Sequence, residues 1–226
     1  SAKEKRDILW SLTAAEGLER YLHTRYVGQK RFSLEGGESF LAALQQVILQ
    51  GARQGIIDFV IGMAHRGRLN VLANIMQKPA ADIFTEFEGR PSEDSVFDGD
   101  VKYHMGYSAD VKTPDGKTVH ISLTPNPSHL ETVGPVVLGI TRAKRDGLHQ
   151  RDESKVCPIL VHGDAAIAGQ GVAYEAAQMA ELEAYRVGGT LHFVINNQVG
   201  FTTNYTDART STYCTDIAKV TKCPVF

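Results

Sequence analysis

Apolar residues recur along the chain in two different patterns, and the two patterns alternate. Consecutive, often β-branched apolar residues predict three buried strands, at residues 56–63, 155–162 and 190–195. Apolar residues at helical spacing predict helices over about 13–26, from Phe40 onward, and over 69–76, 128–146 and 169–187. Strands that alternate with helices are typical of an α/β fold, a mostly parallel sheet with helices on both faces. We expect one domain over residues 1–226, with an N-terminal helix and loop (1–37) packed on it.

Local signals add boundaries to this outline. Thr13 and Glu16 have the spacing of a capping box, which predicts a helix start near Thr13. Pro79 is expected to stop one helix and Pro135 to interrupt another, because proline lacks the N–H that a helix needs. Asp115-Gly116 predicts a hairpin near 107–124, as an excursion between core units, and residues 88–100 read as a surface loop.

Composition excludes several classes of protein. Of the 226 residues, 42% are hydrophobic, and 24 basic against 26 acidic residues give a formal net charge of −2, which disfavours nucleic acid as a partner. The longest apolar stretches fall well short of the roughly 20 residues of a membrane helix. Three cysteines without a Cys-x-x-Cys pair fit a reduced compartment and give no zinc site. The charged, polar segment over residues 1–7 does not resemble a signal peptide. We interpret the small pair Ser1-Ala2, without an initiator Met, as a cloning remnant, and the chain as a piece of a longer protein.

Polar residues follow all three predicted strands. His65-Arg66 comes after the first, Gly163-Asp164 after the second and Asn196-Asn197-Gln198 after the third. In open α/β sheets, ligands bind beyond the carboxyl ends of the strands. Asp164 and Asn197 lie 33 positions apart, about one βαβ unit, so a right-handed crossover brings them to neighbouring lanes.

Carboxylate, amide and carbonyl oxygens suit Mg²⁺ or Ca²⁺, and Mg²⁺ usually adds substrate phosphates, so the spacing favours a phosphorylated cofactor. Gly169-Gln170-Gly171 would open the crossover helix beside that ion, where a helix N-terminus favours an anion. Taken singly, each of these features is also an ordinary turn or strand end.

The joint pattern resembles a known family. Gly-Asp followed after about 30 residues by Asn-Asn resembles the thiamine-diphosphate motif, and six blocks in order resemble the E1 components of 2-oxoglutarate dehydrogenase complexes. These blocks are Arg31–Gly36, Gly62–Leu72, Val101–Gly106, Asn126–Glu131, His162–Ala166 and Val194–Thr203. The resemblance covers nearly the whole chain from about Thr13.

The resemblance implies roles for individual residues. The metal ligands would be Asp164, Asn197 and the backbone carbonyl of Val199. The cofactor-binding residues would be Arg66, Ser128, Leu130, Asp164, Ala165, Ala166 and Asn197. The catalytic residues would be His65 and His104, and the substrate pocket would hold Phe32, His104 and Ser128. Residue 165 departs from the general thiamine motif, which has glycine there; the 2-oxoglutarate family shares the alanine.

The resemblance also implies an activity and partners. The family is an oxidoreductase of the tricarboxylic acid cycle that uses thiamine diphosphate and Mg²⁺ to decarboxylate 2-oxoglutarate, and passes a succinyl group to a lipoyl domain of the E2 component, dihydrolipoyl succinyltransferase, in a multienzyme complex. A homodimer partner would supply the pyrimidine-binding domain, so we expect little or no turnover from residues 1–226 alone. A bacterial parent would be cytoplasmic, the preferred reading, and a eukaryotic one mitochondrial. Alternatives are a transketolase, an E1 enzyme for another 2-oxo acid, and a catalytically silent assembly module.

The remaining polar candidates have structural interpretations. His162 and His192 occur within or beside apolar strands and are interpreted as satisfied core histidines, and His149 as a surface residue. Lys30-Arg31 precedes Phe32 and is expected to be either a solvated turn or a group that faces a carboxylate or phosphate.

Overall fold

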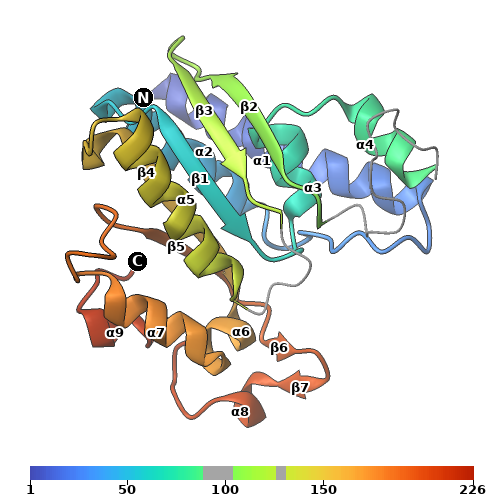
Figure 1. Ribbon diagram of the computed structural model, residues 1–226. Coiled ribbons are helices and arrows are strands. Elements are labelled where there is room, and N and C mark those ends of the chain that lie inside the picture. Colours follow the sequence, from blue (N-terminus) through green and yellow to red (C-terminus); the bar gives the residue numbers. More distant parts are fainter. Residues whose placement is uncertain (89–103, 126–130) are drawn as a thin grey trace.

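The described part of the chain comprises residues 1–88, 104–125 and 131–226 of a computed structural model. Ser128, Leu130 and most of the loop expected over 88–100 lie outside these residues. Within them, one larger sheet has five strands in the order β2-β3-β1-β4-β5 (Figure 1). The strands are β2 (Tyr107–Lys112), β3 (Thr118–Leu123), β1 (Asp58–Met63), β4 (Val156–Gly163) and β5 (Leu191–Ile195). All neighbours are parallel except β2 and β3, so the predicted α/β class with a mostly parallel sheet is confirmed.

Strand β1 is buried on both faces, as its unbroken apolar run predicts. Phe59, Ile61 and Met63 face the larger core, which α1 (Ala2–Arg25), α2 (Ser39–Gln54), α3 (Arg68–Asn70) and the π-helical turn η1 (Val71–Ile75) cover. Val60 faces the other way, into a smaller cluster with α5 (Val133–Leu148). Figure 1 shows α5 crossing the face of the sheet opposite to α1 and α2.

The parallel register aligns the carboxyl ends of the central strands. Met63 of β1 lies beside Val161 of β4, and Gly163 of β4 lies beside Ile195 of β5. The polar residues that follow these strands therefore start from neighbouring lanes at one edge of the sheet. This arrangement confirms the adjacency that the 33-residue spacing predicted.

The N-terminal helix is longer than its apolar pattern indicated. It begins at Ala2, and the capping box is formed by Ser1 and Glu4, so the predicted start at Thr13 is wrong. Thr13 lies inside the helix, where its hydroxyl donates to the carbonyl of Leu9 at 2.8 Å. The first two turns consist largely of charged helix formers without an apolar stripe, and periodicity alone cannot detect such a segment.

The hairpin prediction was right in its turn and wrong in its placement. Gly116 adopts φ +85° between β2 and β3, as an Asp-Gly turn requires. Strand β3, however, pairs in parallel with β1, so the hairpin is an edge of the main sheet and not an excursion. Val119, Ile121 and Leu123 are buried in the larger core, which the local pattern could not assign to a partner strand.

Three helix predictions need correction. The helix expected over 69–76 is a short α-helix, α3, followed by the π-helical turn η1. Pro135 does not interrupt α5, because it occupies the first turn, where the missing N–H has no partner to lose. Of the helix expected over 169–187, only α7 (Gly171–Met179) is helical, and none of its residues is fully buried; a further short helix that the pattern did not predict, α6 (Asp164–Gly169), precedes it.

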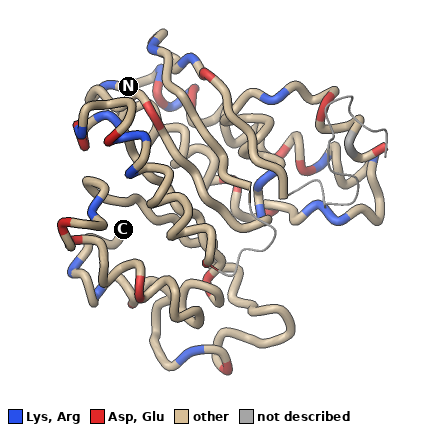
Figure 2. The backbone as a smooth tube through the Cα atoms, viewed as in Figure 1, with Lys and Arg blue, Asp and Glu red and all other residues tan. Residues whose placement is uncertain are grey.

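The remaining elements are peripheral. They are α4 (Ala80–Phe87), the 3₁₀ turn η3 (Glu153–Lys155), the short pair β6 (Val199–Gly200) and β7 (Thr203–Asn204), α8 (Tyr205–Ala208) and α9 (Ala218–Thr221). No helix in the described ranges is both long enough and apolar enough for a bilayer crossing. Basic and acidic residues are interspersed along the backbone tube in Figure 2, in agreement with the small net charge.

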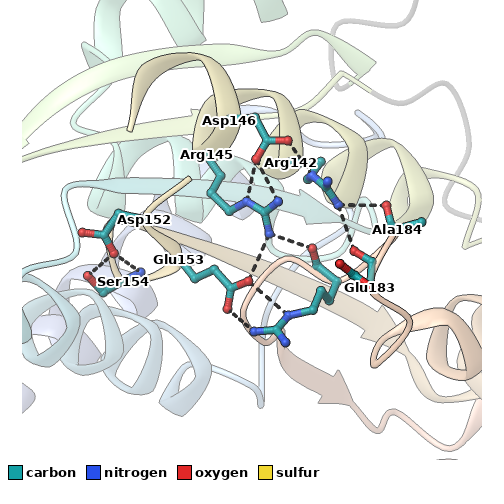
Figure 3. A network of polar contacts seen from close by, with 9 residues as sticks. Arg142, Arg145, Asp146, Asp152, Glu153, Ser154, Glu183 and Ala184 are labelled. Atoms are coloured by element: carbon teal, nitrogen blue, oxygen red, sulfur yellow. Dashed lines mark hydrogen bonds and ion pairs between the residues drawn. The ribbon is translucent and has the colours of Figure 1, made fainter. Parts of the chain in front are cut away.

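An arginine-centred network fastens α5 to the segment that leads into β5 (Figure 3). Arg142 donates to the carbonyl of Ala184 at 2.8 Å, and Arg145, whose side chain is 7% exposed, donates to the carbonyl of Arg186 at 2.9 Å. Both arginines also bind Asp146; hydrogen bonds from Arg142 and then from Arg145 lower the pKa of this carboxyl to about 2. The network thereby fixes the segment that precedes β5, the strand after which Asn197 lies.

A second buried ionic group closes the amino-terminal end of β1. The carboxylate of Asp58 lies 2.5 Å from Nζ of Lys144 and 2.6 Å from Nε2 of His149. The side chain of His149 is only 11% exposed, so its interpretation as a surface residue was wrong. Burial raises the pKa of Asp58, but the hydrogen bonds from Lys144 and His149 together outweigh it and leave the pKa below its ordinary 3.8.

We expect Asp58→Asn to lower the free energy of unfolding by about 2 kcal/mol near pH 7, because two charge-assisted hydrogen bonds are lost. Since the folded-state pKa is lowered, this stability is complete above the ordinary pKa and is lost as pH falls through the folded value. Urea denaturation of both proteins from about pH 7 to pH 3 should therefore show that the difference in their free energies of unfolding becomes smaller as the pH falls. Asp110→Asn, at an exposed carboxylate paired with His120, is the control and should change little; a gap of constant size would contradict the assignment.

Candidate functional site

A cavity of about 630 Å³ opens at the carboxyl ends of β1, β4 and β5. It is lined by residues that follow each of these strands, together with Phe32 from the loop after α1. The lining residues that the sequence singled out are Phe32, His65, Arg66, Asp164, Ala165, Ala166, Asn197 and Val199. Other lining residues are Ala64, His162, Gly163, Gln170, Ile195, Gly200 and Phe201. The structure thus brings together every predicted metal ligand and all of the predicted cofactor-binding residues that lie in the described part.

Asp164 is the most deeply buried acidic group of the cavity. It is the first residue of α6, directly after β4, and is 1% exposed. Its Oδ2 accepts a hydrogen bond from Nη1 of Arg209 at 3.1 Å. Its Oδ1 is buried and has no hydrogen-bond partner within the described residues. A buried carboxylate oxygen without a donor is costly unless a cation or a donor binds there.

Asn197 and Val199 belong to the turn that leads from β5 into β6. The side-chain oxygen of Asn197 accepts the amide of Val199 at 3.3 Å, which closes the turn. Gly200 follows, and a Cβ at this position would lie 2.8 Å from Cβ of Ala165. Turn and helix α6 therefore approach each other so closely that only a small residue at 165 and a glycine at 200 fit. The close approach holds Val199 and Asp164 at the same cavity.

An aromatic and imidazole wall flanks the cavity. The rings of Phe32 and His65 lie 4.8 Å apart, and His65 stacks on His104 with centroids 4.9 Å apart and an interplanar angle of 26°. Phe32 adopts φ +47°, and its carbonyl accepts the amide of Gly67 at 3.0 Å. Nη1 of Arg66 donates to the carbonyl of Ser33 at 2.7 Å. The loop before α2 and the turn after β1 are therefore bound to each other beside the cavity.

Buried polar groups hold this wall from behind. Arg68 is fully buried, and its Nη2 donates at 2.9 Å to the carbonyls of Met105 and Thr124, which fixes the segment that carries His104. Burial lowers the pKa of Arg68 to about 10. Glu19 of α1 accepts the amide of Leu34 at 3.1 Å and lies 3.6 Å from Arg31. Arg31 thus faces a carboxylate, one of the two outcomes expected for it.

The sequence analysis did not predict Arg209 as a part of the site, and it did not predict that His162 lines the cavity. Arg209, which binds Asp164, lies 45 positions further along the chain, in a segment without apolar periodicity, and no local signal marked it. His162 lines the cavity and was correctly interpreted as a satisfied histidine: its Nδ1 lies 2.5 Å from Oε2 of Glu131 and its Nε2 lies 2.9 Å from Nδ1 of His192. His192 itself is exposed on the edge strand, so its assignment to the core was wrong.

The donor set favours a hard cation bound by oxygen atoms. Asp164, Asn197 and Val199 line the cavity, and the carboxylate, amide oxygen and backbone carbonyl that these residues offer suit Mg²⁺ better than a transition metal. In the described ranges, no group of three His, Cys, Asp or Glu side chains could hold a metal ion. A cation at Asp164 would therefore need oxygen atoms from a ligand or water to complete its coordination.

Comparison with known proteins identifies a family and its close relatives. The family model of the dehydrogenase E1 component matches residues 12–226. A 2-oxoglutarate dehydrogenase E1 component from Cupriavidus necator is 55% identical over 225 residues, which cover 99% of this chain and 24% of that protein. The protein of the same name from Haemophilus influenzae is 49% identical over 227 residues, 100% of this chain and 24% of its own length. A 2-oxoglutarate dehydrogenase E1 component from Brucella canis is 50% identical over 233 residues, which cover 98% of this chain and 23% of that protein. The chain thus spans about a quarter of the length of these relatives.

Proposed function

The chain belongs to the dehydrogenase E1 component family, and from that premise we propose that its cavity binds the diphosphate of thiamine diphosphate together with Mg²⁺. We further propose that the whole protein decarboxylates 2-oxoglutarate and transfers the succinyl group to a lipoyl domain of an E2 partner. In this proposal a second subunit completes the cofactor site. The parent is cytoplasmic if bacterial and mitochondrial if eukaryotic.

The observation that carries the proposal is Oδ1 of Asp164, which is buried and has no hydrogen-bond partner among the described residues. Asp164, Asn197 and Val199 all line the cavity, and a carboxylate, an amide oxygen and a backbone carbonyl are ligand types that Mg²⁺ prefers. The close approach of Gly200 to Ala165 keeps two of these proposed ligands, Asp164 and Val199, on adjacent segments. The residues present therefore fit the ion.

The other lining residues fit an anionic substrate at the same cavity. Thiamine diphosphate, when bound, supplies the carbanion and the electron sink that decarboxylation of a 2-oxo acid requires. Arg66 adds a cation to the cavity, and His65 can donate a hydrogen bond to a carboxylate or a developing oxyanion; His104 is not among the lining residues but stacks on His65 directly behind it. Phe32 lines the cavity on the same side and its ring contacts that of His65.

Calorimetric titration of thiamine diphosphate into this chain with Mg²⁺ present tests the cofactor proposal. We expect saturable binding that disappears when EDTA removes the ion, because the ion links Asp164 to the diphosphate. Absence of binding with Mg²⁺ would contradict the proposal and favour a silent assembly module. A panel of 2-oxo acids and sugar phosphates, tested on the whole protein, separates 2-oxoglutarate from pyruvate and from transketolase substrates.

We expect Gly200→Ala to weaken the binding of Mg²⁺ and thiamine diphosphate by about ten-fold, because the added methyl group displaces the turn that carries Val199. Unfolding midpoints should hardly change, since this turn lies outside both hydrophobic clusters. Gly169→Ala is the matched control, because nothing lies within 4 Å of a Cβ built there. The double variant Ala165→Gly, Gly200→Ala restores the space and should recover the affinity; unchanged affinity in Gly200→Ala alone would refute the close approach.

A further inference from the structure

Arg209 and Asp164 form an ion pair that is almost completely buried. The side chains are 6% and 2% exposed, and Nη1 lies 3.1 Å from Oδ2. Asp164 begins α6, whereas Arg209 directly follows α8, so two separate segments meet at this contact. The guanidinium also lies over the ring of Tyr205, with 5.6 Å between Cζ and the ring centroid. Arg209 is therefore held in place from both sides.

The pair satisfies only part of its hydrogen-bonding capacity. Oδ1 of Asp164 and Nε of Arg209 are both buried without a hydrogen-bond partner in the described part of the chain. A structural ion pair normally satisfies its remaining polar atoms, because unsatisfied ones offset the Coulomb attraction. Asp164 lines the cavity and Arg209 is in direct contact with Asp164, so a ligand that contains a cation and an anion could use the open oxygen and approach the guanidinium.

The charge of Arg209 affects the two components of such a ligand in opposite directions. Alone, Asp164 attracts a divalent cation, but with Arg209 in contact the net charge of the pair is zero. A cation that enters at Asp164 is then repelled by a guanidinium a few ångströms away, in an environment of low dielectric constant. A diphosphate is attracted by the same guanidinium.

Resting on the proposed function, we propose that Arg209 sets the order in which the cavity is loaded. Its charge disfavours a divalent ion alone and favours the diphosphate, so the ion enters with the anion or after it. Arg209 acts on both components through its charge and is not a metal ligand.

The test titrates each component separately, in the same buffer at pH 8 for all variants. Binding of Mn²⁺ alone is followed by the electron paramagnetic resonance signal of the free ion, and binding of thiamine diphosphate in EDTA by calorimetry. In Arg209→Gln, which keeps a donor and loses the charge, we expect Mn²⁺ to bind about ten-fold tighter and thiamine diphosphate about ten-fold weaker. Arg209→Lys keeps the charge and should stay within about three-fold of wild type in both titrations.

The shifts of opposite sign distinguish this role from others. If Arg209 only orients the carboxylate, Mn²⁺ binding weakens in Arg209→Gln, and that result overturns the proposal; unchanged binding of both components does so as well. Arg20→Met removes an exposed arginine of α1 and controls for net charge. Arg209→Met, whose stem still packs on Tyr205, replaces Arg209→Gln if urea midpoints show that the latter is unfolded. If the wild-type chain binds neither component even when both are present, the proposed function fails first.

Discussion

Asp164→Asn is expected to abolish measurable Mg²⁺ binding at the cavity, a loss of at least about 100-fold. The substitution keeps the shape of the side chain and removes the charge of Asp164, which is the one acidic residue among the described residues that line the cavity. The amide oxygens and carbonyls that remain cannot replace that charge, since Mg²⁺ gives up its hydration shell reluctantly. Calorimetry with Mg²⁺ and thiamine diphosphate measures the loss directly.

The stability of this variant needs its own control, because Arg209 stays behind as a buried charge without its partner. The double variant Asp164→Asn, Arg209→Gln removes both charges and should unfold close to wild type, yet still fail to bind the ion. Asp207→Asn removes an exposed carboxylate from α8 and should bind normally. Retained binding in Asp164→Asn would place the ion elsewhere and remove the basis of the proposed function.

The sequence predicts the central strands of the sheet because the local pattern of apolar residues is sufficient to identify them. Strands β1 and β4 are unbroken apolar runs, and only a strand buried on both faces requires such a run. The residues directly after them, His65 and Asp164, follow from chain order, and the parallel arrangement brings them to one edge without further information. This logic also led to Asn197 before any family resemblance was considered.

The rest of the site depends on contacts that no local pattern contains. Arg209 reaches Asp164 from a segment without periodicity, and His149 reaches Asp58 from the far end of α5. Both are polar side chains that would be equally reasonable on the surface. Their burial is decided by a charged partner elsewhere in the chain, and single-sequence reasoning has no access to that partner. The same reason explains why the placement of the hairpin was not predicted. The sequence pattern identifies strand β3 itself, but it does not indicate that β3 pairs with β1.

Gly62→Ala is expected to lower the free energy of unfolding by about 3 kcal/mol, the largest effect on stability that we predict. A Cβ at this position of β1 would lie 2.6 Å from a methyl group of Val137 and 3.2 Å from one of Leu160. Val137 is fully buried and β-branched, so it has no alternative rotamer that would make room. Helix α5 must then move away from the sheet, and with it the arginine network that anchors the approach to β5.

A compensating substitution distinguishes this packing effect from a general loss of the fold. Val137→Ala alone should cost about 2 kcal/mol, because it leaves a cavity under α5. The two substitutions together should cost clearly less than their sum, since the new methyl group of residue 62 occupies the space that Val137 vacates. Gly139→Ala, on the same helix and in open space, is the control and should be neutral or slightly stabilising. Urea denaturation of the four variants decides the matter: additive losses would show that residue 62 of β1 and Val137 of α5 are not in close contact.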